Sequence, residues 1–485
     1  MGIVASQSFK NIISTYTGFF IGAINTLFLY TNFMSDTYYG MVGYMLSAAY
    51  VIMPLMAFGV HNTLVKFYSS FKTRMALNSF LTLMLFLPAL MAILLAFVLY
   101  SGYSTIALYL SSENEIIKDY LWHTFIIAFA LAYFEVFYAW VKVNMKTVFG
   151  NFMKEVFHRV GNTVLLCLLH FDYLNIEQFM IGIVIIYVVR MLVMLLYAFS
   201  VKMPVIQYRR IKNLTDILKY SSLIIIAGSI ATILLDVDKV MLGKYIPIEN
   251  VAYYSVGVFI ATVIAVPQRA MHQILLPLTA KYLNTRDFES LSDLYKRSSL
   301  NLFVVGGLIF LLIILNVNQL YSLIDESYRT GLYVVLLISG SKLYDTLLGS
   351  NNAILFNSDY YRVVLLLGVF LVVAMVLLNI ILIPIFGING AACATFTAVF
   401  LYNTGKIVFV YKAFKILPFS SNTSKVGLLI LVLGLSGYFW DFNFHYILNI
   451  VLKSFLIIAA FSFLVYRFKL SKDLNNVIRK NLFSK

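Results

Sequence analysis

Long apolar stretches alternate with short polar clusters along the whole chain. A helix needs about 20 apolar residues to cross the ~30 Å hydrocarbon core of a bilayer. Breaking the chain at its polar clusters therefore predicts fourteen transmembrane helices, of which the fifth and the thirteenth are short. The expected ranges are 11–31, 41–65, 79–100, 120–141, 156–171, 177–200, 216–236, 250–272, 298–317, 331–355, 362–384, 388–411, 425–440 and 446–466.

Composition supports the same class of protein. Of the 485 residues, 61% are hydrophobic and 12% are charged, which is too little polar surface for a soluble domain. A soluble enzyme, a disordered chain, a collagen-like chain and a disulfide-framed secreted protein are excluded. Cys167 and Cys393 each lie in an apolar run, so we expect buried inert thiols and no metal cluster. The prediction is an all-α polytopic membrane protein whose first apolar segment is a retained helix.

The net charge of +15 is explained by topology without any nucleic acid. With the N-terminus inside and the loops alternating, inside loops and adjoining helix ends hold 29 Lys and Arg, and the outside holds four. Acidic residues run the other way, with twelve outside and seven inside. Basic residues collect on cytoplasmic loops, so we expect an even number of helices with both termini in the cytoplasm.

The chain also shows signs of a duplicated organisation. A basic stretch from Lys202 to Lys219 separates the sixth and seventh predicted helices, and Tyr38-Tyr39, Gly43 and Pro54 recur about 215 residues later as Tyr253-Tyr254, Gly257 and Pro267. Two bundles around one cavity are a common transporter design. We predict a six-helix bundle at 1–200, a cytoplasmic linker at 201–215, a second bundle at 216–415, and two extra helices with a basic tail at 416–485. The amphipathic stretch 279–297 is expected to lie on the cytoplasmic membrane face.

Three motifs carry a family resemblance. They are Asp236-Val-Asp-Lys-Val-Met-Leu-Gly243 with Val251-Ala-Tyr-Tyr-Ser-Val-Gly257, the stretch Asn379–Thr395 with its Gly-Ala-Ala-Cys-Ala-Thr ending, and Tyr39-Gly40 with Gly59 and Lys66-Phe-Tyr68. Together they resemble the Wzx-type O-antigen flippases, which are polysaccharide biosynthesis membrane proteins of the multidrug/oligosaccharidyl-lipid/polysaccharide (MOP) exporter superfamily. The resemblance implies a MATE-like fold and alternating-access flipping of undecaprenyl-diphosphate-linked oligosaccharide. It also implies membrane lipid and a polysaccharide polymerase as partners, with no nucleic acid and no catalytic residue.

Two of these motifs also have a reading in physical terms. Pro384, Gly387 and Gly390 are expected to form a tight turn between two helices. Asp236, Asp238 and Lys239 lie where the seventh helix leaves the membrane. They are either a solvated helix end with a local ion pair or an outer gate that pairs differently in two access states. No cofactor or bound metal is expected, and the coupling ion is H+ or Na+.

Charges inside the predicted helices are the candidate site, because each costs at least about 2.5–3.5 kcal/mol to insert. Arg190 lies near the middle of the sixth helix with no acid on its own helix, which favours a water-filled cavity; a guanidinium binds phosphate in bidentate fashion. Lys342 and Asp345 share one face of the tenth helix, either as a functional pair or as a self-neutralised one. Lys66 and Arg269 lie at inner helix mouths and extend the predicted cationic path for a diphosphate.

Two further intramembrane charges have simpler alternatives. Glu135 is predicted either to take part in coupling or to pair with Lys142 or Lys146 at the inner surface. Lys453 is expected to snorkel or to meet a neighbouring helix. A membrane glycosyltransferase or polymerase would need paired carboxylates or a large outer loop, and the chain has neither. A cation-coupled multidrug exporter of the same superfamily is the alternative function.

Overall fold

The protein is helical throughout the part that the structure describes. The computed structural model describes residues 3–209, 211, 213–440, 442 and 444–476, without the side chains of 3–6, 8–9, 226–235, 270, 273 and 361. Arg210 and Lys212 of the basic linker lie outside the described residues. Each predicted transmembrane segment coincides with one or more helices, and no strand occurs in the described ranges, which confirms the all-α prediction.

The number of membrane crossings is not confirmed at fourteen. Among the described residues, nine helices are long and apolar enough to cross a membrane, or up to ten if the bent pair α15 (Leu332–Thr346) and α16 (Asn351–Asn357) forms one span. One of the nine is α17 (Tyr361–Phe414), which contains two of the predicted segments. Length and composition alone therefore leave several predicted crossings unassigned.

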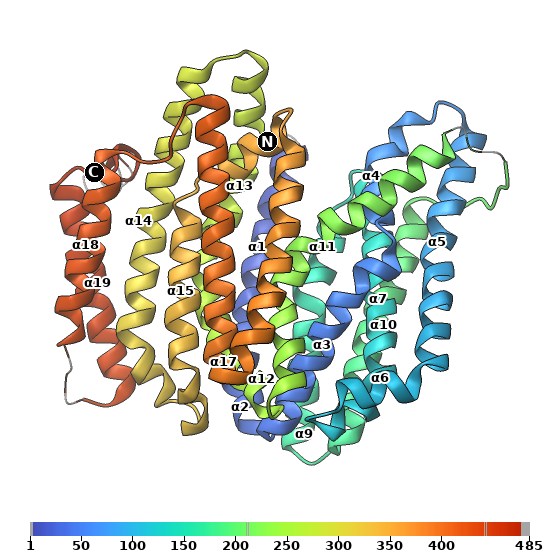
Figure 1. Cartoon of the computed structure of the whole chain (residues 1–485), viewed down its shortest axis with the longest axis horizontal. Coiled ribbons are helices and arrows are strands. Elements are labelled where there is room, and N and C mark those ends of the chain that lie inside the picture. The colour runs from blue at the N-terminus through green and yellow to red at the C-terminus, as the bar shows by residue number, and fades with distance from the viewer. Residues whose placement is uncertain (1–2, 210, 212, 441, 443, 477–485) are drawn as a thin grey trace. The chain divides into compact units, whose positions relative to one another are not determined.

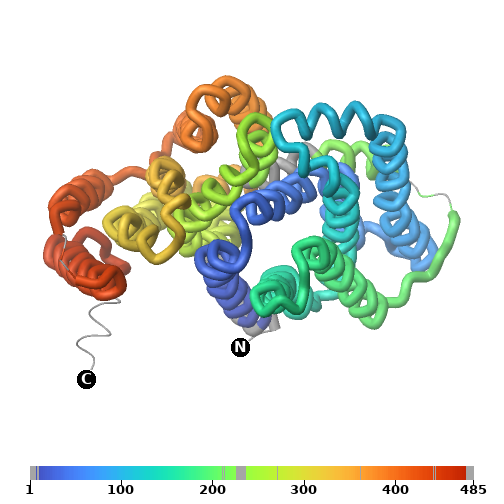
Figure 2. Tube along the Cα trace, turned by 90° about the horizontal axis from the view of Figure 1, so that it is seen from below, coloured from blue at the N-terminus to red at the C-terminus, as the bar shows by residue number. Residues whose placement is uncertain are grey.

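The chain divides into two compact units, Met1–Ser255 and Val256–Lys485, so the boundaries predicted at 201–215 and 416 stay a prediction. In the first unit, α7 is the most buried candidate span and packs on α3 and α10, while α11 packs on α3 and α4. Figure 2 views most of these helices end on. The elements are α1 (Ile3–Ile24), η1 (Asn25–Leu29), α2 (Tyr30–Phe33), α3 (Asp36–Ala57), α4 (Val60–Phe67), η2 (Tyr68–Ser70), α5 (Arg74–Ser101), α6 (Tyr103–Leu110), η3 (Glu115–Tyr120), α7 (Leu121–Lys142), α8 (Val148–Phe152), η4 (Met153–Phe157), α9 (His158–His170), α10 (Ile176–Val201), α11 (Leu214–Tyr245) and α12 (Glu249–Thr262), which crosses the division.

The second unit is built around α14, which packs on α15, α18 and α19. Its core joins Leu311 and Leu315 of α14 to Ile430 of α18 and Phe461 of α19. Lys453 of α19 is buried and donates from Nζ to the carbonyl of Leu315 at 3.1 Å, so it meets a neighbouring helix. The further elements are η5 (Val263–Ala265), α13 (Val266–Asn284), α14 (Phe288–Tyr321), η6 (Glu326–Gly331), α18 (Ser421–Tyr438) and α19 (Tyr446–Arg467).

The turn predicted at Pro384, Gly387 and Gly390 is confirmed. Helix α17 has 54 residues, and its only non-helical backbone is at Gly387, with φ 57° and ψ −134°. The chain reverses there, so that α17 forms two arms, drawn in orange and red in Figure 1. A Cβ on Gly390 would lie 2.1 Å from the carbonyl oxygen of Leu382. Only glycine allows the arms to approach this closely at the turn.

The amphipathic stretch 279–297 is not one surface helix, which corrects the expectation that it lies on the membrane face. It consists of the end of α13 and the start of α14, joined by a turn at Thr285–Asp287. The Asp287 side chain caps α14 by accepting from the backbone N–H of Ser290. Leu291 and Tyr295 are fully buried in a core with α16 and α17. Their apolar face meets protein, and sequence alone could not distinguish this from lipid.

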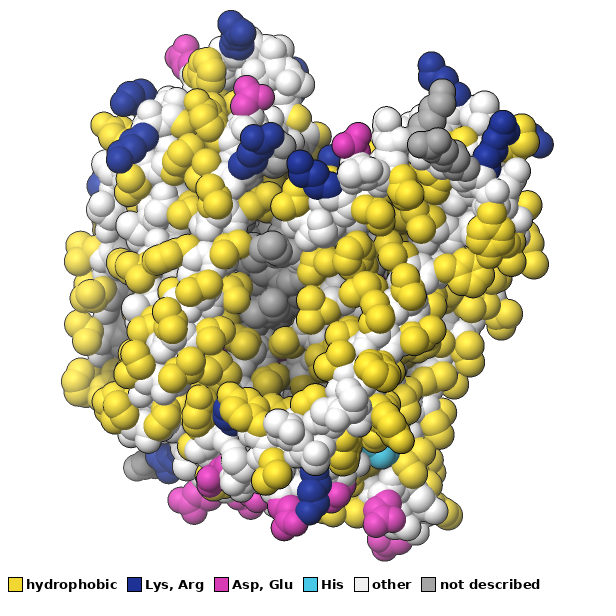
Figure 3. Space-filling view, turned by 45° about the vertical axis from the view of Figure 1, so that its right-hand side comes forward, with side chains coloured by type: hydrophobic (Ala, Val, Ile, Leu, Met, Phe, Trp, Pro, Cys, Tyr) yellow, Lys and Arg dark blue, Asp and Glu magenta, His cyan; other side chains and the backbone are white. Residues whose placement is uncertain are grey.

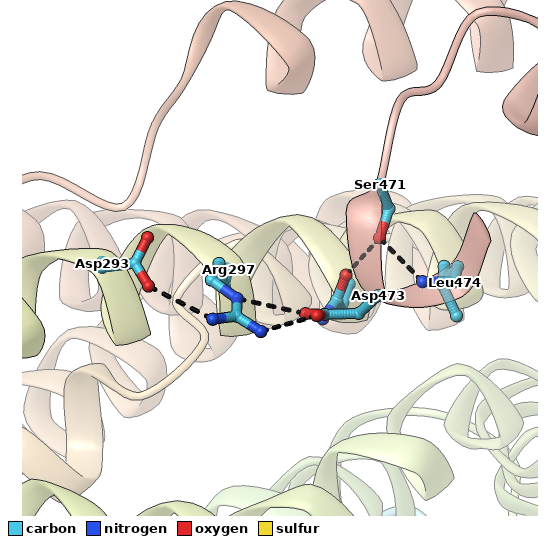
Figure 4. Close-up of polar contacts among 6 residues, drawn as sticks. Asp293, Arg297, Ser471, Asp473 and Leu474 are labelled. Carbon is cyan, nitrogen blue, oxygen red and sulfur yellow. Dashed lines mark hydrogen bonds and ion pairs between the residues drawn. The ribbon is translucent and has the colours of Figure 1, made fainter. Parts of the chain in front are cut away.

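A polar network ties the segment after α19 to the start of α14 (Figure 4). Arg297 donates to Asp473 from Nη2 at 2.6 Å and from Nε at 3.3 Å. Asn301 donates to the same carboxylate at 2.7 Å and accepts from the Ser471 hydroxyl at 2.6 Å. The described part of the tail is thereby fixed to the unit that carries it.

Candidate functional site

A break between α3 and α4 opens a small cavity in the first unit. Pro54 weakens the end of α3, and Phe58 and Gly59 both adopt left-handed backbone, with φ of 45° and 63°. A Cβ on Gly59 would lie 2.3 Å from Ile224 Cγ2 of α11, so glycine lets the break pack against that helix. The cavity has a volume of about 130 Å³ and is lined by Met53, Pro54, Gly59, His61, Glu135, Lys154, Ile224 and Ile225.

The charged wall of this cavity brings Glu135 together with basic groups. Lys154 of η4 donates from Nζ to Glu135 Oε1 of α7 at 2.5 Å. Lys142, one turn after Tyr138, places its Nζ 3.8 Å from the centroid of the Tyr138 ring. The structure thus selects Lys154 as the hydrogen-bonding partner of Glu135, whereas the sequence indicated Lys142 or Lys146. Lys154 lies in a π-helix, a rare turn often found at functional sites.

Arg190 is buried in the same unit but does not line the cavity. Its side chain is 2% exposed, and its guanidinium carbon lies 4.1 Å from the centroid of the Phe134 ring. Tyr187 contributes a second aromatic face at 5.1 Å, and Nη1 lies 3.4 Å from His158 Nδ1. Arg190 forms none of the ion pairs seen among the described residues, and its buried Nε has no hydrogen-bond partner there. Aromatic rings and a histidine therefore hold this cation.

A further cation of this interior, Arg159, was missed by sequence reasoning. Its guanidinium packs over Gly18 and Gly22 of α1, where added Cβ atoms would lie 2.6 and 3.2 Å from it. It also pairs with Glu155 on its own helix at 3.5 Å. The spacing of the two glycines, four residues apart on one helix face, was the signal that could have revealed it.

The other basic candidate of the first unit, Lys66, is exposed at the end of α4. Its Nζ lies 3.7 Å from the centroid of the Tyr220 ring of α11. The contact joins the short helix after the break to α11. The structure thus places Lys66 at a helix end, as the sequence predicted, and outside the lining of the cavity.

The second unit holds Lys342, Asp345 and Arg269 on two helices. Arg269 is exposed on α13, while Lys342 and Asp345 are half-buried on α15. The Asp345 carboxylate accepts a hydrogen bond from Asn403 Nδ2 at 3.1 Å, and its backbone carbonyl accepts from Gln268 Nε2 at 3.3 Å. Asp345 therefore connects α15 with α17 and α13.

Lys406 belongs to the same polar cluster as Asp345, although its place near a predicted inner helix end did not mark it as a site residue. It is 1% exposed within α17, donates from Nζ to Asn352 Oδ1 at 3.0 Å, and lies 4.2 Å from the centroid of the Tyr402 ring. The signal was its place inside the predicted 388–411 helix, five residues before the end. A lysine at that depth must find a partner or face water.

Asp236 and Asp238 lie in a set of carboxylates hydrogen-bonded to hydroxyl groups. Ser47 of α3 donates to Asp236 at 2.8 Å, and Tyr254 of α12 donates to buried Asp238 at 2.6 Å. Both acids are thus bonded to neighbouring helices, which the reading as a solvated helix end did not anticipate.

Two more bonds of this kind join the starts of α3 and α12. Tyr253 donates to Asp36 at 2.8 Å, and Thr37 donates to Glu249 at 2.6 Å. Each helix thus donates one hydroxyl hydrogen bond to a carboxylate of the other. The two bonds connect the two segments that the sequence repeat relates. We call the contacts of Asp36, Thr37, Ser47, Asp236, Glu249 and Tyr253 the α3–α12 seal. On the face drawn in Figure 3, most acidic side chains lie along the lower edge and most basic ones along the upper edge.

Comparison with known proteins identifies the family. A family model described as polysaccharide biosynthesis protein matches residues 8–283, more than half of the chain. The chain belongs to the polysaccharide biosynthesis protein family. No curated protein sequence matches it.

Solved structures define the fold of this family member. The lipid II flippase MurJ, in an inward closed conformation, superposes with a TM-score of 0.69 at 14% identity, over 94% of this chain and 99% of that one. An inward-facing MATE multidrug transporter of the MOP superfamily gives 0.60 at 11% identity, over 84% and 94%. A variant of the Vibrio cholerae MATE transporter VcmN gives 0.58 at 14% identity, over 86% and 98%. The predicted MATE-like helical fold of a multi-pass membrane protein is confirmed.

Proposed function

We propose that this polysaccharide biosynthesis protein flips undecaprenyl-diphosphate-linked oligosaccharide, the repeat unit of O-antigen, capsule or exopolysaccharide, from the cytoplasmic to the outer leaflet of a bacterial inner membrane. Both termini face the cytoplasm in this proposal, and a polysaccharide polymerase uses the product. The family and a fold shared with a lipid II flippase support a lipid-linked substrate. The protein acts as a transporter and has no catalytic residues.

The charge of the interior of the first unit carries the proposal. Around Glu135 of α7 and Glu155 of η4, basic side chains outnumber these two carboxylates. The basic groups at this interior are Lys142, Lys154, Arg159 and Arg190. Four cations and two carboxylates leave two positive charges uncompensated beside apolar walls. A buried charge without a counterion is costly, and a lipid diphosphate would supply the missing anion through charge-assisted hydrogen bonds.

The other predicted residues have parts in this proposal. Lys66, exposed at the end of α4, meets the head group first, and Arg190 holds it within the first unit. Arg269 and Lys342 offer the same charge in the second unit. Glu135 and Asp345 take part in coupling, and each carboxylate accepts a hydrogen bond from another element, Glu135 from Lys154 and Asp345 from Asn403. Asp236 acts in gating at the α3–α12 seal, and Asp238 acts in gating through its bond to Tyr254.

Multidrug export is the second candidate, favoured by the similarity to MATE transporters. The sign of the buried charge separates the two functions. A cationic drug needs uncompensated carboxylates, whereas an anionic diphosphate needs uncompensated cations. The excess of cations around Glu135 and Glu155 favours the diphosphate.

A reconstituted translocation assay tests the proposal. Vesicles holding the purified protein receive a fluorescent undecaprenyl-diphosphate oligosaccharide, and the fraction reaching the outer leaflet is measured by a membrane-impermeant quencher. Arg190→Gln and Lys154→Gln are each expected to lower the initial rate about tenfold or more, since a hydrogen bond to a charged group contributes about 1.5–3 kcal/mol. Lys412→Gln, which neutralises an exposed lysine at the end of α17, is the control and should keep the rate.

The outcome separates the two functions. Full rates in both variants would refute the role of these cations. Ethidium transport by vesicles that do not move the lipid would favour the multidrug exporter. Arg190→Lys retains the charge but loses the planar fork, so it is expected to recover only part of the rate.

A further inference from the structure

The segment from Lys202 to Arg209 follows α10, has no helical or strand structure, and is fixed to the first unit. The Trp140 indole donates to the carbonyl of Lys202 at 3.0 Å, and Lys202 donates to the Tyr68 hydroxyl at 3.0 Å. Thr82 of α5 donates to the carbonyl of Val205 at 3.3 Å and accepts from the backbone N–H of Gln207 at 3.1 Å. We call residues 202–209 the strap; it is the green trace at the right edge of Figures 1 and 2.

The strap turns its large apolar side chains outward. Met203, Val205, Ile206 and Tyr208 are 71%, 56%, 60% and 84% exposed. A loop in water does not normally expose four such side chains in six residues. Since the backbone is held by hydrogen bonds, this exposure is a property of the fixed structure.

The position of the strap along α5 accounts for these side chains. Thr82 follows Arg74, the first residue of α5, by eight residues, or about 12 Å of helix. A head-group region is about 5–8 Å thick on each side of the hydrocarbon core. If Arg74 lies at the outer edge of the head groups, the strap beside Thr82 lies about 4–7 Å inside the hydrocarbon core, at the level of the first part of the acyl chains.

Basic side chains surround the strap without acidic partners. Lys72, Arg74 and Arg209 are exposed, and Arg209 Nη1 lies 3.6 Å from the sulfur of Met75, next to Arg74. Neither these residues nor Lys202 forms any ion pair found among the described residues. The sequence has no Asp or Glu at 37–112 or at 178–215. These cations repel each other unless anions from outside the protein approach them.

We propose that the strap and its basic neighbours bind the head groups of anionic phospholipids in the adjoining leaflet. The basic side chains contact the lipid phosphates, and the apolar side chains of the strap insert beside the acyl chains. Alternation of basic and apolar side chains at one membrane level is the pattern of an interfacial anchor. A nucleic acid or an acidic protein would satisfy the charges but would leave the apolar side chains in water, so lipid is the partner that fits both.

Lipid contact at Tyr208 can be measured directly. The test protein is the full chain with Cys167→Ala, Cys393→Ala and Tyr208→Cys. Bimane is attached to the cysteine introduced at position 208, and the labelled protein is reconstituted into phosphatidylcholine vesicles. Nitroxide-labelled phosphatidylglycerol or phosphatidylcholine is then added at equal mole fraction. We expect several-fold stronger quenching by phosphatidylglycerol, since each nearby basic residue favours an anionic lipid about fivefold.

Two triple variants decide whether this preference belongs to the strap. K72Q/R74Q/R209Q is expected to make the two lipids quench equally. The matched control K281Q/K296Q/K412Q neutralises three exposed basic residues of the second unit and should retain the preference. Both variants are checked for folding by size-exclusion chromatography.

Several results would overturn the proposal. Equal quenching by the two lipids in the parent chain would show no preference for anionic lipid. An equal loss in the control triple would assign the preference to net charge. Displacement by inorganic phosphate would indicate a site for soluble anions, and absence of quenching by either lipid would leave the strap facing water or a soluble partner.

Discussion

Replacing Thr37 with valine and Tyr253 with phenylalanine is expected to open the α3–α12 seal. Each change removes one hydroxyl that donates to a half-buried carboxylate, Glu249 at 2.6 Å and Asp36 at 2.8 Å. A hydrogen bond to a charged group contributes about 1.5–3 kcal/mol. Taking the lower value because both acids retain some water, the pair of changes costs the closed seal about 3 kcal/mol. That equals a shift of roughly 150-fold in the ratio of closed to open protein.

Cysteine labelling reports this shift. Ser255 is 9% exposed and lies beside Gly43, whose added Cβ would be 3.3 Å from the Ser255 hydroxyl. Ser255→Cys, in a chain with Cys167→Ala and Cys393→Ala, should therefore react slowly with a membrane-impermeant maleimide while the seal is closed. In the double variant the labelling rate should rise by a factor of up to roughly 150. In each single variant it should rise by about tenfold.

Two hydroxyls outside the seal serve as matched controls. Thr31 donates to the carbonyl of Leu27 on its own helix, and the buried Tyr30 hydroxyl has no hydrogen-bond partner among the described residues. Thr31→Val and Tyr30→Phe remove the same chemical groups but leave the seal intact. If labelling accelerates equally in the controls, or stays slow in the double variant, the seal does not hold these helices together.

Three further predictions follow from single contacts. Gly390→Ala places a Cβ 2.1 Å from a backbone oxygen, so the yield of monodisperse protein should collapse, whereas Gly434→Ala, with 3.5 Å of room, should be tolerated. Asn114→Ala leaves two carbonyls and one N–H at the α11–α12 turn without their hydrogen-bond partner. Each unsatisfied buried group costs about 1–3 kcal/mol, so the midpoint of thermal unfolding should fall by several degrees. An unchanged midpoint would contradict this. The bond from Arg297 lowers the pKa of Asp473 below its ordinary 3.8. The ion pair adds about 0.5 kcal/mol of stability, because both side chains are largely exposed. This stability is complete above about pH 4 and is lost as the pH falls through the lowered pKa of Asp473 in the folded protein. The free energy of unfolding of D473N should therefore depend less on pH in the acid range.

The membrane segments could be predicted because each is a long apolar run interrupted by charge. The α17 turn was also readable, since Pro384, Gly387 and Gly390 leave few other backbone paths. The apolar face of 279–297 was misassigned because lipid and a protein core select the same residues. Leu291 and Tyr295 show that burial there depends on α16 and α17, which are distant in sequence.

The site residues were harder to predict than the helices. An insertion cost identifies which charges are unusual, so Arg190 and Glu135 could be selected from their own helices. Their partners could not, because Lys154 and Phe134 reach them only through packing of α7, η4 and α10. Lys406 was missed because a lysine near a helix end has the same sequence whether it reaches water or turns toward Asn352.

The α17 turn has a consequence for how the protein is made. Each arm has about 26 residues, or about 39 Å of helix, which is enough to cross a bilayer. With Gly387 as the only break, no loop exists that could wait in water while the second arm is synthesised. The two arms should therefore leave the ribosome and enter the lipid together as one hairpin. An insertion of a long polar tag at Gly387 would then disturb membrane integration itself, before any step of transport could be measured.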